Sequence, residues 1–450
     1  MTALAHVPYI APPSGYEGPR RSLILAGGGM RVAYQAGVVR ALHEEGLRFQ
    51  HADGTSGGTM NLAMLLSGLS PEDMCSRWRT IDVKDFVSLL PLSMYARGPA
   101  DLPALGGAEG VVKRVFPHLG IDIEKIRAAH GMHGTFNVCN YTRKTSEVIP
   151  HENLDLPLLL AGISLPIFMS PVPHNRSLYM DSVWIRDANL SEAVRRGSDE
   201  IWVVWCIGNM GEYLTGAFNQ YVHMIELSAN GNLFKELAEI ATLNRSRGHS
   251  IRVHVIHPEY PLPLDPDYFK GHIDGATLVD RGYRDAAAYL ANVNPDGVQL
   301  GPDSTRMRDP LPGITLRASL RGSLGDEPCR LDCSVEIADL NTFLADSDHT
   351  ATLSGRITSP GVGDQKPATG GSVRFRRQME VDLGFKQDGG TVRLSASGDG
   401  TWKVGLGTRR GELKLDRLPA ALSIHATGVH SFAQRLRTLI RFWAFLLRGR

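Results

Sequence analysis

Two glycine-rich turns, each placed between an apolar run and a helical pattern, constrain the fold of this chain more than any other feature. The first turn, residues 27–29, follows the apolar run 23–26, and the second holds Ser56 between Gly54 and Gly58. An apolar run that ends in glycines is typical of a buried parallel strand leading into a tight loop. Because a helical pattern follows each turn, the sequence predicts two consecutive strand–turn–helix units.

Strand and helix patterns continue to alternate as far as residue 293. Strands are predicted at 135–139, 146–149, 201–207 and 251–256, and residues 171–181 are read as a turn feeding a short strand that ends in an acid. Helices are predicted at 31–45, 61–68, 158–163, 191–196, 233–243 and 276–293. This alternation favours an α/β domain with a mainly parallel central sheet. The proline- and glycine-rich segment 90–110 is either a lid at an entrance or a plain surface connection.

Changes in composition divide the chain into five segments. Residues 294–313 are rich in proline, glycine and charge, as linkers are. Beyond them, apolar and polar residues alternate over several short runs separated by glycines, which predicts a small antiparallel β domain. We therefore predict a loose N-terminal arm at 1–20, an α/β domain at 21–293, a linker at 294–313, a β domain at 314–428 and a helix at 429–450.

The last segment has the pattern of a basic amphipathic helix. One helical face is apolar and consists of Leu436, Leu439, Ile440, Trp443 and Leu447, with Phe442 and Phe445 widening that face. All of the charged residues are arginines, namely Arg435, Arg437, Arg441, Arg448 and Arg450. The segment is too short and too charged to span a bilayer. A helix lying in the lipid headgroup layer fits this pattern, and the alternative is a helix packed on the β domain with its arginines in water.

The composition limits the partners and the compartment. The 48 basic and 47 acidic side chains give a formal net charge of +1, so no overall field favours nucleic acid. Five scattered cysteines without a CxxC pair favour a reducing compartment. Residues 1–20 lack the basic start and apolar core of a secretory signal. We expect a cytoplasmic protein that is peripheral at the inner face of the membrane where its C-terminal helix binds lipid.

The segment Gly54-Thr55-Ser56-Gly57-Gly58 matches the G-x-S-x-G pattern, in which a serine nucleophile occupies a tight strand-to-helix turn. The motif alone is common, but here an extended segment precedes it and a triple-glycine loop lies one unit upstream. Backbone N–H groups in such a loop can stabilise the oxyanion of an acyl-transfer reaction. A dinucleotide fingerprint would need glycine at position 32, and a phosphate-binding P-loop would need Gly-Lys-Ser/Thr, which this loop lacks.

Residues 22 to about 293 resemble the patatin-like phospholipases, a family of serine lipid acyl hydrolases with a three-layer α/β fold. Three motifs carry the resemblance in the family's order: the loop Gly27-Gly28-Gly29-Met30-Arg31, the nucleophile motif at 54–58, and the strand-end acid of Tyr179-Met180-Asp181. Residues 164–168 before the acid and 190–193 after it also have the family's spacing. The resemblance covers more than half of the chain and implies a lipid or phospholipid substrate.

The resemblance further implies a catalytic Ser-Asp dyad in place of a triad. Ser56 is the expected nucleophile and Asp181 the expected general base, which also activates the water that hydrolyses the acyl-enzyme. A carboxylate in an apolar cleft has its pKa raised by desolvation, which makes it a better base. Asp187, six residues further on, is a second candidate acid.

The other motif residues have supporting roles in the family. The N–H groups of Gly27, Gly28 and Gly29 are the expected oxyanion donors, and Arg31, Gly54 and Gly58 complete the two motifs. No histidine is needed, and we interpret His51 as structural because it belongs to the incoming strand. The sequence predicts no metal site and no cofactor.

Two positions depart from the family pattern, which usually has glycine at position 32 and Gly-Gly or Gly-Ala after the acid. This chain has Val32 and Ser182-Val183 there. We predict a phospholipase A-like acyl hydrolase that cleaves esters of phospholipids or neutral lipids through an acyl-enzyme. The alternatives are a catalytically weak or inactive lipid-binding or regulatory protein on the same scaffold, which the departures favour, and a soluble esterase or thioesterase.

Overall fold

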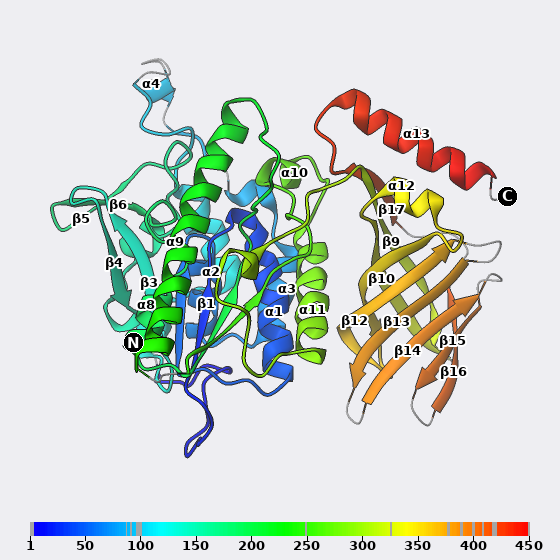
Figure 1. The fold of residues 1–450 in the computed structure, drawn as a ribbon, viewed down its shortest axis with the longest axis horizontal. Coiled ribbons are helices and arrows are strands. Elements are labelled where there is room, and N and C mark those ends of the chain that lie inside the picture. The colour runs from blue at the N-terminus through cyan, green and yellow to red at the C-terminus, as the bar shows by residue number, and fades with distance from the viewer. Residues whose placement is uncertain are drawn as a thin grey trace. The chain divides into compact units, whose positions relative to one another are not determined.

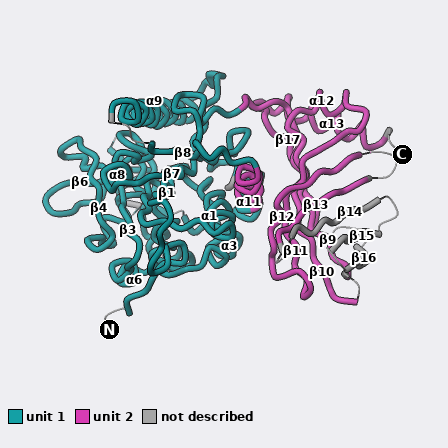
Figure 2. Tube along the Cα trace, turned by 60° about the horizontal axis from the view of Figure 1, so that its bottom comes forward, with its two compact units in different colours: residues 1–279, 292–307 teal, residues 280–291, 308–450 magenta. Residues whose placement is uncertain are grey.

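The computed structural model describes residues 4–86, 88–90, 92–95, 101–247, 250–324, 326–375, 379–387, 390–397, 401–406, 409–415 and 421–448. The chain forms two compact units, which Figure 2 colours separately. The first unit comprises residues 1–279 and 292–307, and the second comprises residues 280–291 and 308–450. The catalytic residues expected from the sequence all belong to the first unit.

The first unit is built around an eight-stranded sheet (Figure 1). Its strands lie in the order β5-β6-β3-β2-β1-β7-β8, with β4 paired to β3. The neighbours among β3, β2, β1, β7 and β8 are parallel, whereas β4, β5 and β6 pair antiparallel. The strands are β1 (Arg21–Leu25), β2 (His51–Thr55), β3 (His133–Asn140), β4 (Thr145–Pro150), β5 (Val172–His174), β6 (Ser177–Asp181), β7 (Glu200–Val204) and β8 (Arg252–Ile256).

Helices cover both faces of this sheet and give the unit three layers. The apolar side chains of α8 and α9 pack against alternate residues of β1, β7 and β8, and α1 with α3 lies on the other side (Figure 1). The helices are α1 (Ala33–Glu44), α2 (Gly58–Leu66), α3 (Pro71–Thr80), α4 (Leu92–Tyr95), α5 (Phe116–Leu119), α6 (Ile123–Ala128), α7 (Leu156–Ala161), α8 (Leu190–Arg195), α9 (Ala217–Arg247) and α10 (Asp265–Phe269). The predicted α/β domain with a mainly parallel sheet is confirmed.

Helix α9 is much longer than its sequence pattern predicted. It spans 31 residues, whereas apolar periodicity indicated a helix only over 233–243. The N-terminal half of the helix buries the polar side chains of Glu226 and Asn230 and contains Gly231. These residues interrupt the apolar stripe from which an amphipathic helix is recognised.

The N-terminal segment is held on the first unit and is not the loose arm that its prolines suggested. The side chain of Ile10 is fully buried, and its carbonyl accepts the N–H of Phe49 at 2.8 Å. The His6 Nε2 atom lies 2.8 Å from the carbonyl oxygen of Leu66. A short buried stretch around Ile10 and Ala11, with backbone hydrogen bonds, therefore anchors residues 4–20, a pattern too short for composition to reveal.

The second unit contains a nine-stranded antiparallel sheet that closes on itself. Each strand from β9 to β16 pairs with the next, and β16 pairs again with β9, so eight strands form a closed path. β17 pairs with another part of β9. The strands are β9 (Gly313–Leu324), β10 (Glu327–Ile337), β11 (Thr350–Ser359), β12 (Gly363–Phe375), β13 (Met379–Gln387), β14 (Gly390–Ser397), β15 (Thr401–Leu406), β16 (Arg409–Leu415) and β17 (Ala421–Thr427). The predicted antiparallel β domain is confirmed.

Three helices accompany this sheet. α12 (Leu340–Ala345) and α13 (Phe432–Arg448) pack Phe343 and Phe442 into the apolar core, together with strand residues such as Leu331 and Leu383. The third helix, α11 (Gly275–Ala291), contributes its residues 280–291 to the second unit. There Arg281 pairs with Glu336 of β10 at 2.6 Å.

Helix α13 presents apolar side chains on two of its faces. Phe442 is completely buried, and Phe445 packs against the same core. A second set of apolar side chains is exposed by 48% or more: Phe432, Leu436, Ile440, Trp443 and Leu447. Phe442 and Phe445 therefore dock the helix and do not widen its exposed face, which corrects the expectation from the sequence.

The polar side of α13 is only partly described. Arg435, Arg437 and Arg441 lie within the described residues, whereas the side chain of Arg448 and all of Arg450 lie outside them. No helix among the described residues combines the length and apolar character that crossing a membrane requires.

Candidate active site

Ser56 occupies a strained turn between β2 and α2. Strand β2 ends at Thr55 and helix α2 begins at Gly58, so only two residues connect them. Ser56 has a φ of 51°, a left-handed conformation that residues with a side chain rarely adopt. Such strain is typical of a nucleophile elbow, because it lifts the serine hydroxyl out of the backbone that surrounds it.

The two residues that follow this serine have no room for a side chain. A Cβ atom on Gly58 would lie 2.0 Å from the Leu25 carbonyl oxygen, and one on Gly57 would lie 2.5 Å from that of Gly29. The Gly57 Cβ would also lie 2.8 Å from a methyl group of Val32. Val32, which departs from the family pattern, is thus accommodated by the absence of a side chain at position 57.

The triple-glycine loop passes directly beside the serine turn. The Gly27 N–H donates to Asp187 Oδ1 at 3.0 Å, whereas within the described residues the N–H groups of Gly28 and Gly29 have no acceptor. Arg31 braces the loop, because its Nε donates to the Gly28 carbonyl at 2.9 Å. Gly28 and Gly29 therefore remain available to an incoming oxyanion.

Asp181 is the last residue of β6 and is buried next to Ser56. Burial raises the pKa of its carboxyl group to about 7, and the Ser56 hydroxyl and the Val183 N–H partly offset the rise. The Val183 N–H donates to Oδ1 at 2.9 Å, whereas Oδ2 has no close hydrogen-bond partner within the described residues. The contact with Ser56 is loose, which is common for such pairs before substrate binds.

The second acid, Asp187, lies near the same loop, where it accepts a hydrogen bond from the Gly27 N–H. Burial and the nearby Asp181 carboxylate raise the pKa of Asp187 to about 8, against the opposite effects of the Gly27 N–H and Arg31. Its Oδ1 is occupied by Gly27, and its Oδ2 has no partner among the described residues. Of the two acids, Asp181 is the one whose charge the Ser56 hydroxyl stabilises.

The residues that follow Asp181 do not disturb the acid. The Ser182 hydroxyl lies 3.1 Å from that of Ser146 on β4, away from the carboxylate. The side chain of Val183 forms part of the cavity wall above Ser56. The second departure from the family pattern therefore changes the shape of the cavity more than the position of Asp181.

A network of buried side chains supports the serine turn from within the sheet. Asp53 on β2 accepts hydrogen bonds from Thr135 and Asn137 on β3. Asn137 also donates to Thr55 Oγ1 at 2.9 Å and accepts from Asn189 at 2.8 Å. Because Asn189 caps α8 at the end of the loop that follows Asp181 and carries Asp187, Asn137 ties strand β2 to that loop.

His51 belongs to the same network. Its ring nitrogens lie 2.8 Å from the hydroxyl oxygens of Ser22 and Thr135. Burial lowers the pKa of His51 to about 3, so the ring is neutral at ordinary pH. The geometry agrees with a structural role for this histidine.

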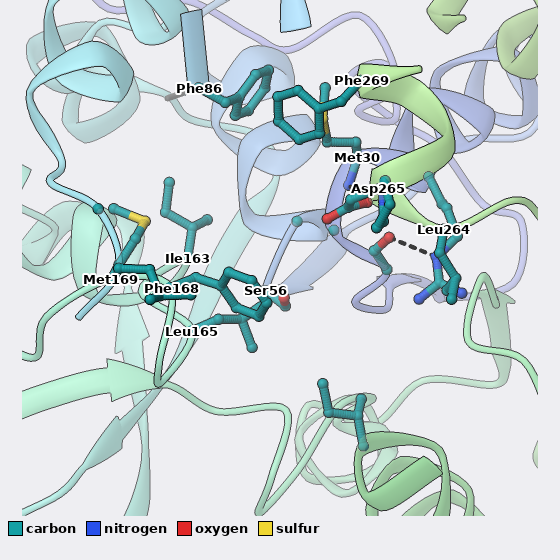
Figure 3. Close-up of a pocket in the computed structure, with 18 of the residues that line it drawn as sticks. Met30, Ser56, Phe86, Ile163, Leu165, Phe168, Met169, Leu264, Asp265 and Phe269 are labelled. Carbon is teal, nitrogen blue, oxygen red and sulfur yellow. Dashed lines mark hydrogen bonds between the residues drawn. The ribbon is translucent and has the colours of Figure 1, made fainter. Parts of the chain in front are cut away.

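An apolar cavity of about 650 Å³ opens above Ser56 (Figure 3). Its wall is mostly apolar and comes from several segments, with Met30, Ile163, Leu165, Phe168, Met169 and Phe269 among its side chains. Leu105 and its two following glycines also line it, which favours the entrance interpretation of segment 90–110; residues 91 and 96–100 lie outside the described part of that segment. A wall of this kind suits a fatty acyl chain.

Sequence patterns did not point to three residues around this site. Asp265 on α10 accepts the Met30 N–H at 3.1 Å, but 235 positions separate the two residues. Asn137 and Asn189 are single polar residues near apolar runs, and only their burial identifies them. Within the described residues, no cluster of His, Cys, Asp and Glu is arranged to hold a metal ion.

The first unit thus combines a three-layer α/β domain with a serine on a strained turn beneath an apolar cavity. Residues 23–194 match the family model described as Patatin-like phospholipase, so the chain carries a domain of that family. The resemblance stated from the motifs is thereby confirmed over these residues.

Two solved structures show weak similarity. One is a chain from the complex of full-length SpcU with full-length ExoU from the type III secretion system of Pseudomonas aeruginosa, 16% identical over 60% of this chain and 53% of that chain, with a TM-score of 0.29. The other is the type III effector protein ExoU, 12% identical over 53% of this chain and 61% of that chain, with a TM-score of 0.23. The present chain thus spans less than two thirds of either neighbour. No curated protein matches the chain significantly.

Proposed function

We propose that this protein is a lipid acyl hydrolase that cleaves carboxylic esters of phospholipids or neutral lipids. Ser56 is the nucleophile, Asp181 the general base, and the N–H groups of Gly28 and Gly29 the oxyanion donors. The observation that carries the proposal is the strained Ser56 at the base of an apolar cavity, with a buried carboxylate and two open amides beside it.

The proposed reaction proceeds through two acyl transfers. Ser56 Oγ attacks the ester carbonyl and passes its proton to Asp181, which then protonates the departing alkoxide as its bond to the carbonyl carbon breaks. Water next attacks the acyl-enzyme, with Asp181 again taking a proton, and the Ser56 Oγ–carbonyl bond breaks to release a fatty acid. A pKa of about 7 lets the same carboxyl group accept and return protons near neutral pH.

A fluorophosphonate probe tests the nucleophile directly. We expect the wild type to become covalently labelled and the Ser56→Ala variant to lose the label. Ser88→Ala is the matched control, because Ser88 lines the same cavity without lying on the serine turn. Labelling that survives in Ser56→Ala would refute the assignment, and lipid binding by an unlabelled wild type would favour the non-enzymatic alternative.

We also propose that α13 contacts the membrane surface. Its exposed face carries Ile440 and Trp443, and Arg437 and Arg441 are exposed on the same helix with no acidic residue in the helix. An exposed apolar face flanked by arginines fits an interface of anionic lipid headgroups and acyl chains. This contact would hold the enzyme at the surface that contains its substrate.

Vesicle co-sedimentation tests this contact. We expect the wild type to bind phosphatidylglycerol vesicles more strongly than phosphatidylcholine vesicles, and the double variant Ile440→Ser/Trp443→Ser to lose most of this binding. Leu422→Ser on β17 is the control, because Leu422 is 53% exposed, similar to Ile440 at 57%. Equal losses in both variants would contradict a specific role of α13.

A further inference from the structure

The backbone amides of the oxyanion loop face carboxylates at both ends. Asp187 accepts the N–H of Gly27, and Asp265 accepts the N–H of Met30. Only the two amides between them, those of Gly28 and Gly29, lack an acceptor among the described residues. Any anion bound by these two amides would therefore lie close to the Asp265 carboxylate.

Asp265 lies especially close to this position. A Cβ atom on Gly29 would be 2.7 Å from Asp265 Oδ2 and 3.0 Å from Oδ1, so the carboxylate lies against the Gly29 backbone. Asp265 also lines the cavity above Ser56, and Figure 3 shows it beside Met30. Its positive neighbour is Arg31, which opposes the rise in the Asp265 pKa that burial causes.

A charge at this place acts differently on substrate and product. The substrate ester is neutral, so the carboxylate does not repel it. Hydrolysis of the acyl-enzyme forms a bond from a water oxygen to the carbonyl carbon, breaks the bond to Ser56 Oγ, and leaves a fatty acid that ionises to a carboxylate. This product has its negative charge beside the amides of Gly28 and Gly29, where a nearby negative charge raises its free energy.

We propose that the Asp265 carboxylate promotes release of the fatty-acid product by repelling it from the Gly28 and Gly29 amides. The inference rests on the proposed function and adds a product-release residue to that site. The same charge also opposes the transient oxyanion, so Asp265 lowers the rate of acylation while it limits product inhibition. The apolar cavity makes such a device useful, because it would otherwise retain the acyl chain of the product.

The substitution Asp265→Asn separates charge from shape. Asparagine keeps an oxygen that can accept the Met30 N–H, but it removes the negative charge. At pH 8 we expect the inhibition constant of decanoate against fluorophosphonate labelling of Ser56 to fall at least about threefold, given the strength of charge pairs at contact distance. Labelling without decanoate is expected to become faster, because the phosphonyl oxygen uses the same amides.

Two further variants control the experiment. Asp267→Asn removes a charge two residues from Asp265. The Asp267 carboxylate lies 3.0 Å from His272 Nδ1 and does not line the cavity, so this variant should have the decanoate inhibition constant of the wild type. Asp265→Glu keeps the charge and should retain weak decanoate inhibition. This second variant still tests the inference if Asp265→Asn fails to fold. Unchanged or weaker decanoate inhibition in Asp265→Asn, or strong inhibition in folded Asp265→Glu, would overturn the inference. Absence of labelling in every protein would instead overturn the proposed function and this inference with it.

Discussion

The polar groups buried beneath Ser56 and those buried beside it differ in how completely they are hydrogen-bonded. Asp53, in the sheet below, has both carboxylate oxygens bonded by side chains of β3. Asp181 and Asp187, at the cavity side, each retain one oxygen without a partner in the described part of the chain. All three are completely or almost completely buried, and burial raises the pKa of each.

The difference separates a supporting role from a chemical one. A buried carboxylate whose oxygens are both bonded holds its neighbours in place, and changing it breaks several bonds at once. A buried carboxylate with an open oxygen is a less stable arrangement, and such sites are retained where a proton has to be accepted. The two groups should therefore respond in opposite ways to the same substitution.

The largest effect is expected for Asp181→Asn. Loss of the general base should lower kcat by about 10²- to 10⁴-fold, while the free energy of unfolding stays unchanged or increases, because a poorly solvated charge is removed. Hydrolysis of a fluorogenic ester and thermal unfolding measure the two quantities.

The companion substitution is Asp53→Asn. It should lower stability, because its new amide would face the donor group of Asn137, and leave activity per folded molecule within about tenfold of the wild type. Full activity in Asp181→Asn would show that Asp181 is not the general base and would make Asp187 the next candidate for that role.

The next effect in size concerns Asn137→Ala. Removal of this amide leaves the buried partners Asp53, Thr55 and Asn189 with unmade hydrogen bonds. We expect a loss of about 2 to 4 kcal/mol in the free energy of unfolding, measured by urea denaturation. Asn232→Ala is the control, since Asn232 makes a single 3.3 Å bond to Ser228 within α9 and should change stability little. A loss below about 1 kcal/mol for Asn137→Ala would show that the network contributes little.

A smaller effect is expected in the pH dependence of stability. The folded-state pKa of Asp187 is raised from 3.8 to about 8, so between these values the folded protein holds a proton that the unfolded chain releases. Stability from this group therefore falls as pH rises from about 4 to 8 and is constant above. Asp187→Asn should remove this fall and be more stable than wild type at pH 8, with little difference at pH 4.

The same substitution should leave the titration of Asp181 nearly unchanged. Asp187 carries no charge below about pH 8, so its removal should hardly alter the Asp181 pKa of about 7 or the acidic limb of kcat/KM. An identical stability difference at pH 4 and pH 8 would contradict the protonation of Asp187 in the folded protein.

Local patterns were sufficient for the order of the elements and for the serine turn. The glycines on both sides of Ser56 and the apolar runs before the turns are determined by contacts within one strand–turn–helix unit. Units of this kind occur in many sequences, so their local pattern is recognisable. Helix α9 and the N-terminal segment were predicted less well, because buried Glu226, buried Asn230 and the anchor Ile10 act through distant partners.

The candidate site was predictable only in part for the same reason. Ser56 and Asp181 lie in recognisable motifs, but the roles of the amides depend on which carboxylates reach them. Gly27 was expected among the oxyanion donors, and its N–H is bonded to Asp187. Asp265 comes from a helix 235 positions away in sequence from Met30, so no local pattern could place it against the loop.

The smallest expected effect concerns an uncharged buried hydroxyl group, which tests the same difference between hydrogen-bonded and unpaired polar groups. Thr59 lies three residues after Ser56, is completely buried, and its hydroxyl oxygen has no hydrogen-bond partner in the described residues. Thr59→Val should therefore be neutral or stabilising by up to about 1 kcal/mol, because the substitution removes an unpaired polar group without changing the side-chain volume much. Thr135→Val, in the satisfied network, should instead be destabilising, since it unpairs Asp53 and His51. Equal changes in the melting temperatures of the two variants would mean that hydrogen-bond satisfaction does not distinguish the two regions.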